Sequence, residues 1–235
     1  MDKKSLLVTI ILGIVFPVFV LITSLELAVF NKEFFLNELN NNNVSTTTGI
    51  ISSEFSEMTD QIFAFLKGER ADFDIYAEKE NDRYVPLFTQ DEMTHMDDVR
   101  GLFQIVLWIQ AICGILFAAA LVLLMFWNRS GIARGIFWGS IGGLIILMLI
   151  GIAACFDFTE VFVKMHELIF TNDLWYLDPA ESVLINIVPE PYFIKLALRI
   201  LIYATSIFLI CTVAFGLLSK KLVSKTFSKN SKRKF

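Results

Sequence analysis

Apolar residues are gathered in four long runs along the chain, and charged segments separate these runs. The runs cover about residues 6–30, 99–127, 136–156 and 192–218. A helix needs about 20 apolar residues to cross the hydrocarbon core of a bilayer. The hydrophobic content of 55% also exceeds the roughly 45–50% that is usual in soluble domains. The sequence therefore predicts an all-α membrane protein with four transmembrane helices.

Positive and negative charges are segregated between the segments that join the spans. The N-terminal end, the turn between the second and third spans and the tail 219–235 together hold eleven Lys/Arg and one acid. The loop 31–98 holds fifteen Asp/Glu against five Lys/Arg, and the loop 157–190 holds seven against one. Because basic segments stay in the cytoplasm, we expect one membrane domain, 1–235, with both termini and the basic tail inside and both loops outside.

The first apolar run has a competing interpretation as a signal peptide, since Lys3 and Lys4 precede it. The run is longer than the apolar region of a typical signal peptide, however. A cut after Ala28 would place Glu26 where a small residue belongs. We therefore interpret the run as a retained membrane anchor.

The first loop is expected to contain one amphipathic helix after a polar connector. The connector, about 40–48, is rich in Asn and Thr and predicts little structure. Beyond it, apolar residues recur at helical spacing on one face, and Gly68 ends the pattern; these residues are Ile50, Ile51, Phe55, Met58, Ile62 and Phe65. The passage 69–88 has no clear pattern, and Asp72–Val85 resembles a short strand or a loop.

Three capping signals predict further helices in the loops. Thr89-Gln-Asp-Glu92 is a capping box, from which a helix runs directly into the second span. Asp157-Phe-Thr-Glu160 opens a helix after the third span, with an apolar face of Val161, Phe162, Met165, Leu168 and Ile169. Asp178-Pro-Ala-Glu181 predicts the start of a short helix to about Val188. These helices, with the one in the first loop, predict a small extracytoplasmic cap.

The chain has two histidines, and both stand next to spans. His95 lies in the second turn of the helix that enters the second span, and Asp98 lies one turn later, within reach to orient its imidazole. His166 lies on the helix that follows the third span. A lone histidine at a membrane interface is usually a polar anchor, but a pair flanked by carboxylates favours general acid–base catalysis.

Two other kinds of site compete with a histidine pair. Zinc could bind both histidines with Asp97, Asp98, Glu167 or Asp173, although Phe170 stands where an H-E-x-x-H motif needs its second histidine. A serine nucleophile has no G-x-S-x-G motif to support it. Cys155 is the one thiol near the outer surface, and an apolar setting would raise its pKa and weaken it as a nucleophile.

Charged residues also lie inside two of the predicted spans. Glu26 is near the outer end of the first, and Lys195 and Arg199 are one turn apart near the outer end of the fourth. Such residues are costly in lipid and often functional. We expect Glu26 to pair with Lys195 or Arg199 and join these spans, the alternative being a polar lining for a substrate cleft.

Two segments resemble a known family. His95-Met-Asp-Asp-Val99, before the second span, and His166-Glu-Leu-Ile-Phe-Thr-Asn-Asp-Leu-Trp-Tyr-Leu-Asp-Pro179, after the third, are similar to the lipoprotein intramolecular transacylases, small four-span membrane proteins of Gram-positive bacteria. The resemblance extends over nearly the whole chain. It implies catalytic roles for His95 and His166, and we expect support from Asp98 and from Asn172, Asp173, Trp175 and Asp178 of the second segment.

The resemblance also implies a reaction. The enzymes of this family move an acyl chain from the sn-2 oxygen of a diacylglyceryl group to the α-amine of the N-terminal cysteine of a bacterial lipoprotein, giving the lyso-form. The implied partners are the diacylglyceryl lipoprotein and membrane lipids, with no nucleic acid, metal or cofactor. A non-enzymatic membrane accessory or sensor protein and a metal-dependent membrane hydrolase remain the alternatives.

Overall fold

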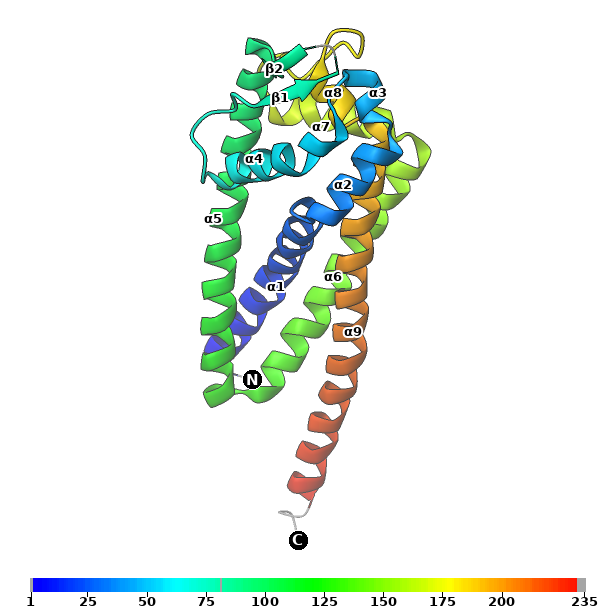
Figure 1. The fold of residues 1–235 in the computed structure, drawn as a ribbon. Helices are drawn as coiled ribbons and strands as arrows, with labels where there is room; N and C mark the ends of the chain where they lie inside the picture. The colour runs from blue at the N-terminus through cyan, green and yellow to red at the C-terminus, as the bar shows by residue number, and fades with distance from the viewer. Residues whose placement is uncertain (1, 81, 232–235) are drawn as a thin grey trace. The chain divides into compact units, whose positions relative to one another are not determined.

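The computed structural model describes residues 2–80 and 82–231, with side chains given except for residues 82, 83 and 222–231. Four helices of this described part are long and apolar enough to cross a membrane. They are α1 (Lys3–Val29), α5 (Gln90–Trp127), α6 (Arg129–Phe156) and α9 (Glu190–Ser231) (Figure 1). The chain therefore has the all-α fold with four membrane helices that the apolar runs predict.

The chain divides into two compact units. The bundle unit consists, within the described residues, of 2–25, 108–152 and 200–231. The loop unit consists of Glu26–Leu107 and Ala153–Arg199, and it holds both histidines. Each long apolar helix contributes residues to both units.

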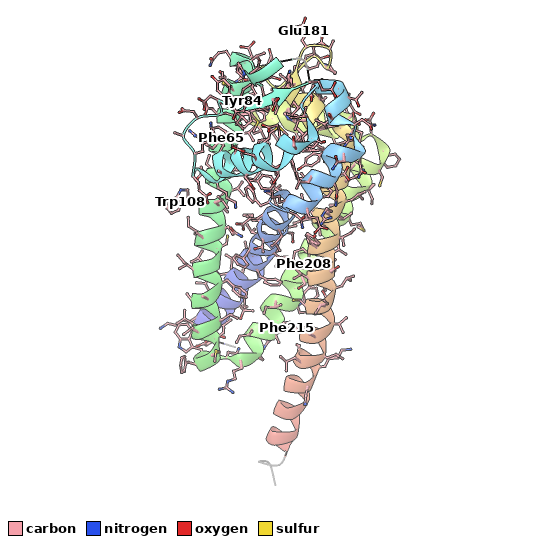
Figure 2. All side chains as sticks on the ribbon, in the orientation of Figure 1. Phe65, Tyr84, Trp108, Glu181, Phe208 and Phe215 are labelled. Atoms are coloured by element: carbon pink, nitrogen blue, oxygen red, sulfur yellow. The ribbon has the colours of Figure 1, made fainter. Side chains whose placement is uncertain are left out.

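Small residues allow close packing inside the bundle unit. A methyl group added at Gly139 of α6 would lie 2.7 Å from the carbonyl oxygen of Gly13 in α1, so the two backbones touch. A methyl group added at Gly143 of α6 would lie 2.5 Å from the ring of Phe208 of α9, the residue labelled in Figure 2. Lipid offers no hydrophobic force between helices, and such contacts supply the packing energy instead. The buried core around them is Leu12, Phe16, Val20, Ala120, Leu124, Ile136, Leu147, Ala204 and Phe208.

The polar connector of the first loop is helical, so the prediction of little structure there was wrong. Helix α2 covers Lys32–Asn41, and the side chain of Asn31 caps it by accepting a hydrogen bond from the Phe34 amide. Helix α3 covers Val44–Thr48 and lies between two residues in the left-handed conformation, Asn43 and Gly49. Asn residues thus stand at the ends of both helices, and the hydroxyl of Thr48, inside α3, donates to the Val44 carbonyl.

The amphipathic helix of the first loop is present. A 3₁₀ turn, η1 (Ser52–Glu54), leads into α4 (Phe55–Lys67), which ends at Gly68 in the left-handed conformation, as the sequence predicts. Its buried face includes Met58 and Phe65, and Phe65 contacts Phe73 with ring centroids 4.9 Å apart. Burial of this face against other parts of the loop unit anchors the helix.

The passage that the sequence left unassigned contains a β-hairpin. Strands β1 (Tyr76–Lys79) and β2 (Asp82–Pro86) pair antiparallel, with Tyr76 opposite Pro86 and an irregular register after Glu78. Tyr76 and Tyr84 stack with ring centroids 5.8 Å apart. An isolated bridge joins Lys79 to Ile50 and connects the hairpin to the segment before α4.

Two shorter helices occupy the second loop. Helix α7 covers Phe158–Ile169, and the side chain of Asp157 caps it as predicted, accepting a hydrogen bond from the Glu160 amide. Helix α8 covers only Val183–Ile187 and begins later than predicted, because Ser182 is its cap. The Asp178 carboxylate instead accepts a hydrogen bond from the Ala180 amide, which closes a turn and not a helix.

An ion pair between a buried carboxylate and a partly exposed ammonium fixes α2 to the start of α9. The ammonium of Lys195 lies 2.6 Å from a carboxylate oxygen of Glu38, a residue only 5% exposed. The expected pairing of Lys195 with Glu26 was therefore wrong, because Glu38 belongs to a helix that the sequence did not predict. Pairing of Glu26 with Arg199 stays a prediction.

We expect Lys195→Met to lower the free energy of unfolding by about 1–3 kcal/mol, because it removes a charged hydrogen-bond donor from a buried carboxylate. Lys32→Met is the matched control. It breaks a pair of equal length with Asp60, whose side chain is 61% exposed, and such pairs contribute less than about 1 kcal/mol. Thermal unfolding in bicelles would compare the two variants, and equal losses would contradict the assignment.

Candidate active site

The first histidine is held by the start of α5. The Thr89 amide donates to Glu92 Oε2 at 2.7 Å, and the Glu92 amide donates to the Thr89 hydroxyl at 3.3 Å, which is the predicted capping box. His95 follows one turn later, before the apolar part of the helix, and is 7% exposed. Its Nδ1 atom is buried and has no hydrogen-bond partner among the described residues.

The second histidine is held by α7. His166 is the one buried residue of this helix, whereas the apolar Met165 and Leu168 are exposed. Part of the predicted apolar face of α7 is thus exposed, whereas the histidine is buried in the loop unit. The Nδ1 atom of His166 lies 2.8 Å from the Phe162 carbonyl oxygen, one turn earlier on the same helix.

The two imidazoles lie together among aromatic side chains. Their ring centroids are 6.3 Å apart. Phe170 contacts both rings, at 5.1 Å from His95 and 5.6 Å from His166. Phe162 lies 4.2 Å from the ring of His166, and Trp175 lies 5.0 Å from it. The fold therefore brings the two histidines, 71 positions apart in the sequence, into one apolar cluster.

The hydrogen bond to Phe162 fixes the tautomer of His166. A carbonyl oxygen can only accept, so Nδ1 must carry the proton and donate it. In the neutral ring the lone pair then lies on Nε2. His166 accordingly presents Nε2 as a base, in an orientation that its own helix determines.

Burial keeps both imidazoles uncharged. Desolvation lowers the pKa of His95 to about 4, helped by the nearby His166 and opposed by the negative charge of Asp98. Desolvation also lowers the pKa of His166, and the hydrogen bond to Phe162 opposes this shift. Two neutral imidazoles side by side can accept and donate protons near pH 7.

Asp98 does not hydrogen-bond to His95, contrary to the prediction that it orients the ring. Its Oδ2 atom accepts a hydrogen bond from Asn172 Nδ2 at 2.9 Å, and its direct effect on His95 is that of its charge on the pKa. Asn172 Oδ1 in turn accepts from the Leu174 amide at 3.1 Å. Asp98 and Asn172 thus join α5 to the segment that follows α7.

The other expected supporting residues have different positions. Trp175 packs on His166, as described above. The carbonyl of Asp173 accepts from the Tyr176 amide in a turn, and Asp178 closes the turn that precedes Ser182. Lys195 contacts Glu38, and the guanidinium of Arg199 lies 4.5 Å from the ring centroid of Phe34. These contacts place both cations against α2.

The metal and nucleophile alternatives have no matching geometry in the described part of the chain. No group of three or more His, Cys, Asp and Glu side chains there is arranged to hold a metal ion. Cys155 is exposed, whereas both histidines are buried. The histidine pair is therefore the arrangement that the described residues support best.

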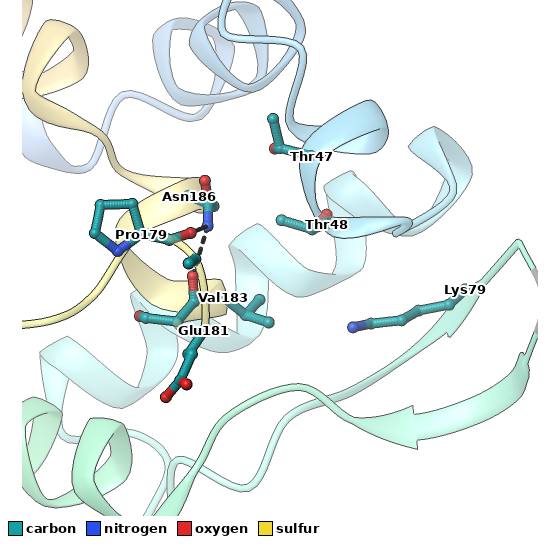
Figure 3. A pocket seen from close by; sticks show the side chains of 9 residues that line it. Thr47, Thr48, Lys79, Pro179, Glu181, Val183 and Asn186 are labelled. Atoms are coloured by element: carbon teal, nitrogen blue, oxygen red, sulfur yellow. Dashed lines mark hydrogen bonds between the residues drawn. The ribbon is translucent and has the colours of Figure 1, made fainter.

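A polar cleft of about 410 Å³ also lies in the loop unit, and neither histidine lines it. Thr47, Thr48, Lys79, Glu181 and Asn186 are among its lining residues (Figure 3). The Asn186 amide donates to the carbonyls of Pro179 and Ser182, and the two threonine hydroxyls donate to backbone carbonyls of α3 or its cap. The hydroxyls of Thr47 and Thr48 and the amide of Asn186 thus stabilise local structure.

Two features of the site were missed from the sequence. One is Glu92, which was recognised as part of a capping box but also contacts Ser182 and the Leu184 amide. The other is the contact of Phe162 and Phe170 with the imidazoles, beside the expected Trp175. The i, i+4 spacing of Phe162, His166 and Phe170, which extends along α7 to its C-cap, was the available signal for the two phenylalanines.

Comparison with known proteins identifies the family and agrees with the fold. The family model described as lipoprotein intramolecular transacylase Lit matches residues 10–193. No curated protein sequence matches the chain. Among solved structures, that of the membrane integral lipoprotein intramolecular transacylase Lit from Bacillus cereus superposes with a TM-score of 0.80 at 18% identity, covering 95% of this chain and 100% of that one.

Two further structures of the Bacillus cereus protein carry a single histidine replaced by arginine or by alanine. Both superpose with a TM-score of 0.73 at 18% identity and cover 94% of this chain, and 95% and 96% of their own chains respectively. At this identity the structures show the shared fold, and the family model shows the relationship. The chain is a multi-pass membrane protein that belongs to the lipoprotein intramolecular transacylase family.

Proposed function

We propose that this protein moves the sn-2 acyl chain of a diacylglyceryl lipoprotein to the α-amine of its N-terminal cysteine, with His95 and His166 as the catalytic residues. The observation that carries the proposal is the buried pair of imidazoles, 6.3 Å apart between ring centroids. Family membership supports the reaction class, an acyl transfer on a lipoprotein.

The orientation of His166 suits the role of base. An α-amine has an ordinary pKa of about 7.7–8.0, so a substantial fraction is already neutral near pH 7 and can attack the ester carbonyl. Nε2 of His166 would then take the proton that the nitrogen loses as the amide bond forms. The same proton would pass to the sn-2 oxygen as its bond to the carbonyl breaks, so the reaction needs no net proton.

The low pKa of His95 suits a second role. An imidazole that stays neutral keeps one N–H group as a donor, and it can stabilise the negative charge that develops on the carbonyl oxygen. Amine and ester belong to one substrate molecule, so much of the catalysis is orientation. This scheme needs no covalent acyl-enzyme.

We further propose that the loop unit faces the outside and that both termini lie in the cytoplasm. The charge segregation between loops and termini supports this orientation. It would place the histidines where the lipoprotein amine emerges from the membrane, with lipid tails and anionic headgroups close by.

Replacing either histidine should nearly abolish product formation. His95→Gln and His166→Gln should each slow formation of the N-acyl lyso-form from a synthetic diacylated lipopeptide by about 10²–10⁴-fold, because each removes a positioned proton-transfer group. Mass spectrometry of the product measures this rate. Glu167→Gln is the matched control, since its exposed side chain contacts only Lys164. Full activity in either histidine variant would refute the mechanism.

The orientation can be tested with single cysteines. In a protein lacking Cys113, Cys155 and Cys211, Thr46→Cys and Glu181→Cys should react with an impermeant maleimide added to intact cells. Arg129→Cys and Lys220→Cys should react only after the membrane is opened. All four wild-type side chains are exposed, so accessibility within the protein does not limit labelling. The opposite pattern would move the site to the cytoplasm.

The depressed pKa of His95 predicts a pH-dependent stability. In the folded protein this imidazole stays neutral down to about pH 4, whereas in the unfolded chain it gains a proton near 6.5. The unfolded state therefore binds more protons between these values. The stability contributed by neutral His95 is complete above about pH 6.5 and falls as the pH drops toward 4.

The thermal unfolding temperature of the wild-type protein should accordingly decrease across this window more steeply than that of His95→Gln. The comparison isolates His95, because the carboxylates that titrate in the same range are present in both proteins. Parallel curves would show that His95 is not buried as a neutral group.

A further inference from the structure

The face of α5 that carries His95 also carries a carboxylate one turn before it and another one turn after it. Glu92, His95 and Asp98 are spaced by three residues each, which places them along one side of the helix. Glu92 is 1% exposed, and Asp98 is partly buried. Carboxylates in such positions need hydrogen-bond donors to offset the loss of water.

The donors to Glu92 come from two segments that are far apart from each other in the sequence. Oε2 accepts from the Thr89 amide at 2.7 Å. Oε1 accepts from the Ser182 hydroxyl at 2.5 Å and from the Leu184 amide at 2.8 Å. Ser182 itself caps α8 by accepting from the Ile185 amide. The carboxylate thus joins the start of α5 to the start of α8.

Asp98 makes the corresponding connection on the other side of His95. Its bond with Asn172 joins α5 to the beginning of the segment that leads from α7 to α8. The segment 170–184 is therefore attached to α5 near both of its ends, at 172 and at 182–184. Between these points Trp175 packs on His166, and at its start Phe170 contacts both imidazoles.

We propose that Glu92 and Asp98 are positioning residues for the two histidines, acting through the segment 170–184, which they attach to α5 on either side of His95. The segment carries the aromatic rings that set the place of His166 relative to His95. The catalytic consequence rests on the proposed function, whereas the geometric consequence can be measured apart from it.

Two variants break the attachments. Glu92→Gln leaves one acceptor oxygen, so it cannot keep the Thr89 bond together with the bonds from Ser182 and Leu184, and its NH2 group faces an N–H donor in either orientation. Asp98→Ala removes the acceptor for Asn172. Each should lower kcat for the N-acyl product by about 10–100-fold with KM changed less than about threefold, because a displacement near 1 Å of a positioned group can cost about 10²-fold.

Three comparisons separate positioning from simple stabilisation. Asp98→Asn keeps an oxygen that can accept from Asn172, so it should recover most of the kcat lost in Asp98→Ala. Asp91→Asn and Asp97→Asn alter exposed neighbours on the same helix and should leave kcat unchanged. Ile187→Ala truncates a buried side chain of α8, 1% exposed, and provides a destabilised protein in which both attachments remain.

The burial of the two imidazoles can be measured separately from activity. Mass spectrometry gives the rate at which diethyl pyrocarbonate modifies His95 and His166. Burial should protect both rings in the wild-type protein, and Glu92→Gln and Asp98→Ala should each speed modification at least about fivefold. If Glu92→Gln fails to fold, Ser182→Ala and Asn172→Ala remove the donors instead and should have the same effects in a milder form.

Unchanged modification rates, or a kcat that falls only as far as in Ile187→Ala at equal thermal stability, would overturn the proposal. A wild-type protein that makes no N-acyl product would instead refute the proposed function. In that case the modification rates still decide whether the carboxylates position the histidines.

Discussion

The buried carboxylate of Glu92 constrains the loop unit more than any other single group described above. A carboxylate that is 1% exposed is stable only if donors surround it. Those donors belong to Thr89, Ser182 and Leu184, so the first and second loops must meet at one place. His95 lies one turn away, and its position relative to the second loop follows from this meeting.

The same burial that makes Glu92 costly gives the histidines their chemistry. Aromatic rings remove water from both imidazoles, and the loss of water favours the neutral form. A neutral ring at physiological pH can accept a proton or donate one. An apolar shell also limits the water that would compete with the amine for the ester, which matters for a transfer whose nucleophile lies in the same molecule.

Local signals predicted the parts of this structure that depend on neighbours in sequence. The sequence predicted the four apolar runs, the capping box at Thr89 and the cap at Asp157. Each of these features depends on residues that are close together in the chain. The Glu38–Lys195 pair and the bonds of Glu92 to the second loop span 157 and about 90 positions, and no local pattern records them. Helices α2 and α3 were missed because Asn and Thr signal loops in isolation, although here Asn stands at helix ends and Thr lies within α3.

The sequence separation between Glu92 and its donors in the second loop also determines when their contacts can form during synthesis of the chain. Ser182 and Leu184 are made 90 and 92 residues after Glu92, which at about 5–20 residues per second takes roughly 5–20 s. The apolar part of α5 and the whole of α6 must be synthesised in that interval. The nascent chain therefore holds His95 with an incomplete set of contacts until the second loop arrives, and the loop unit closes only when the last membrane helix is about to follow.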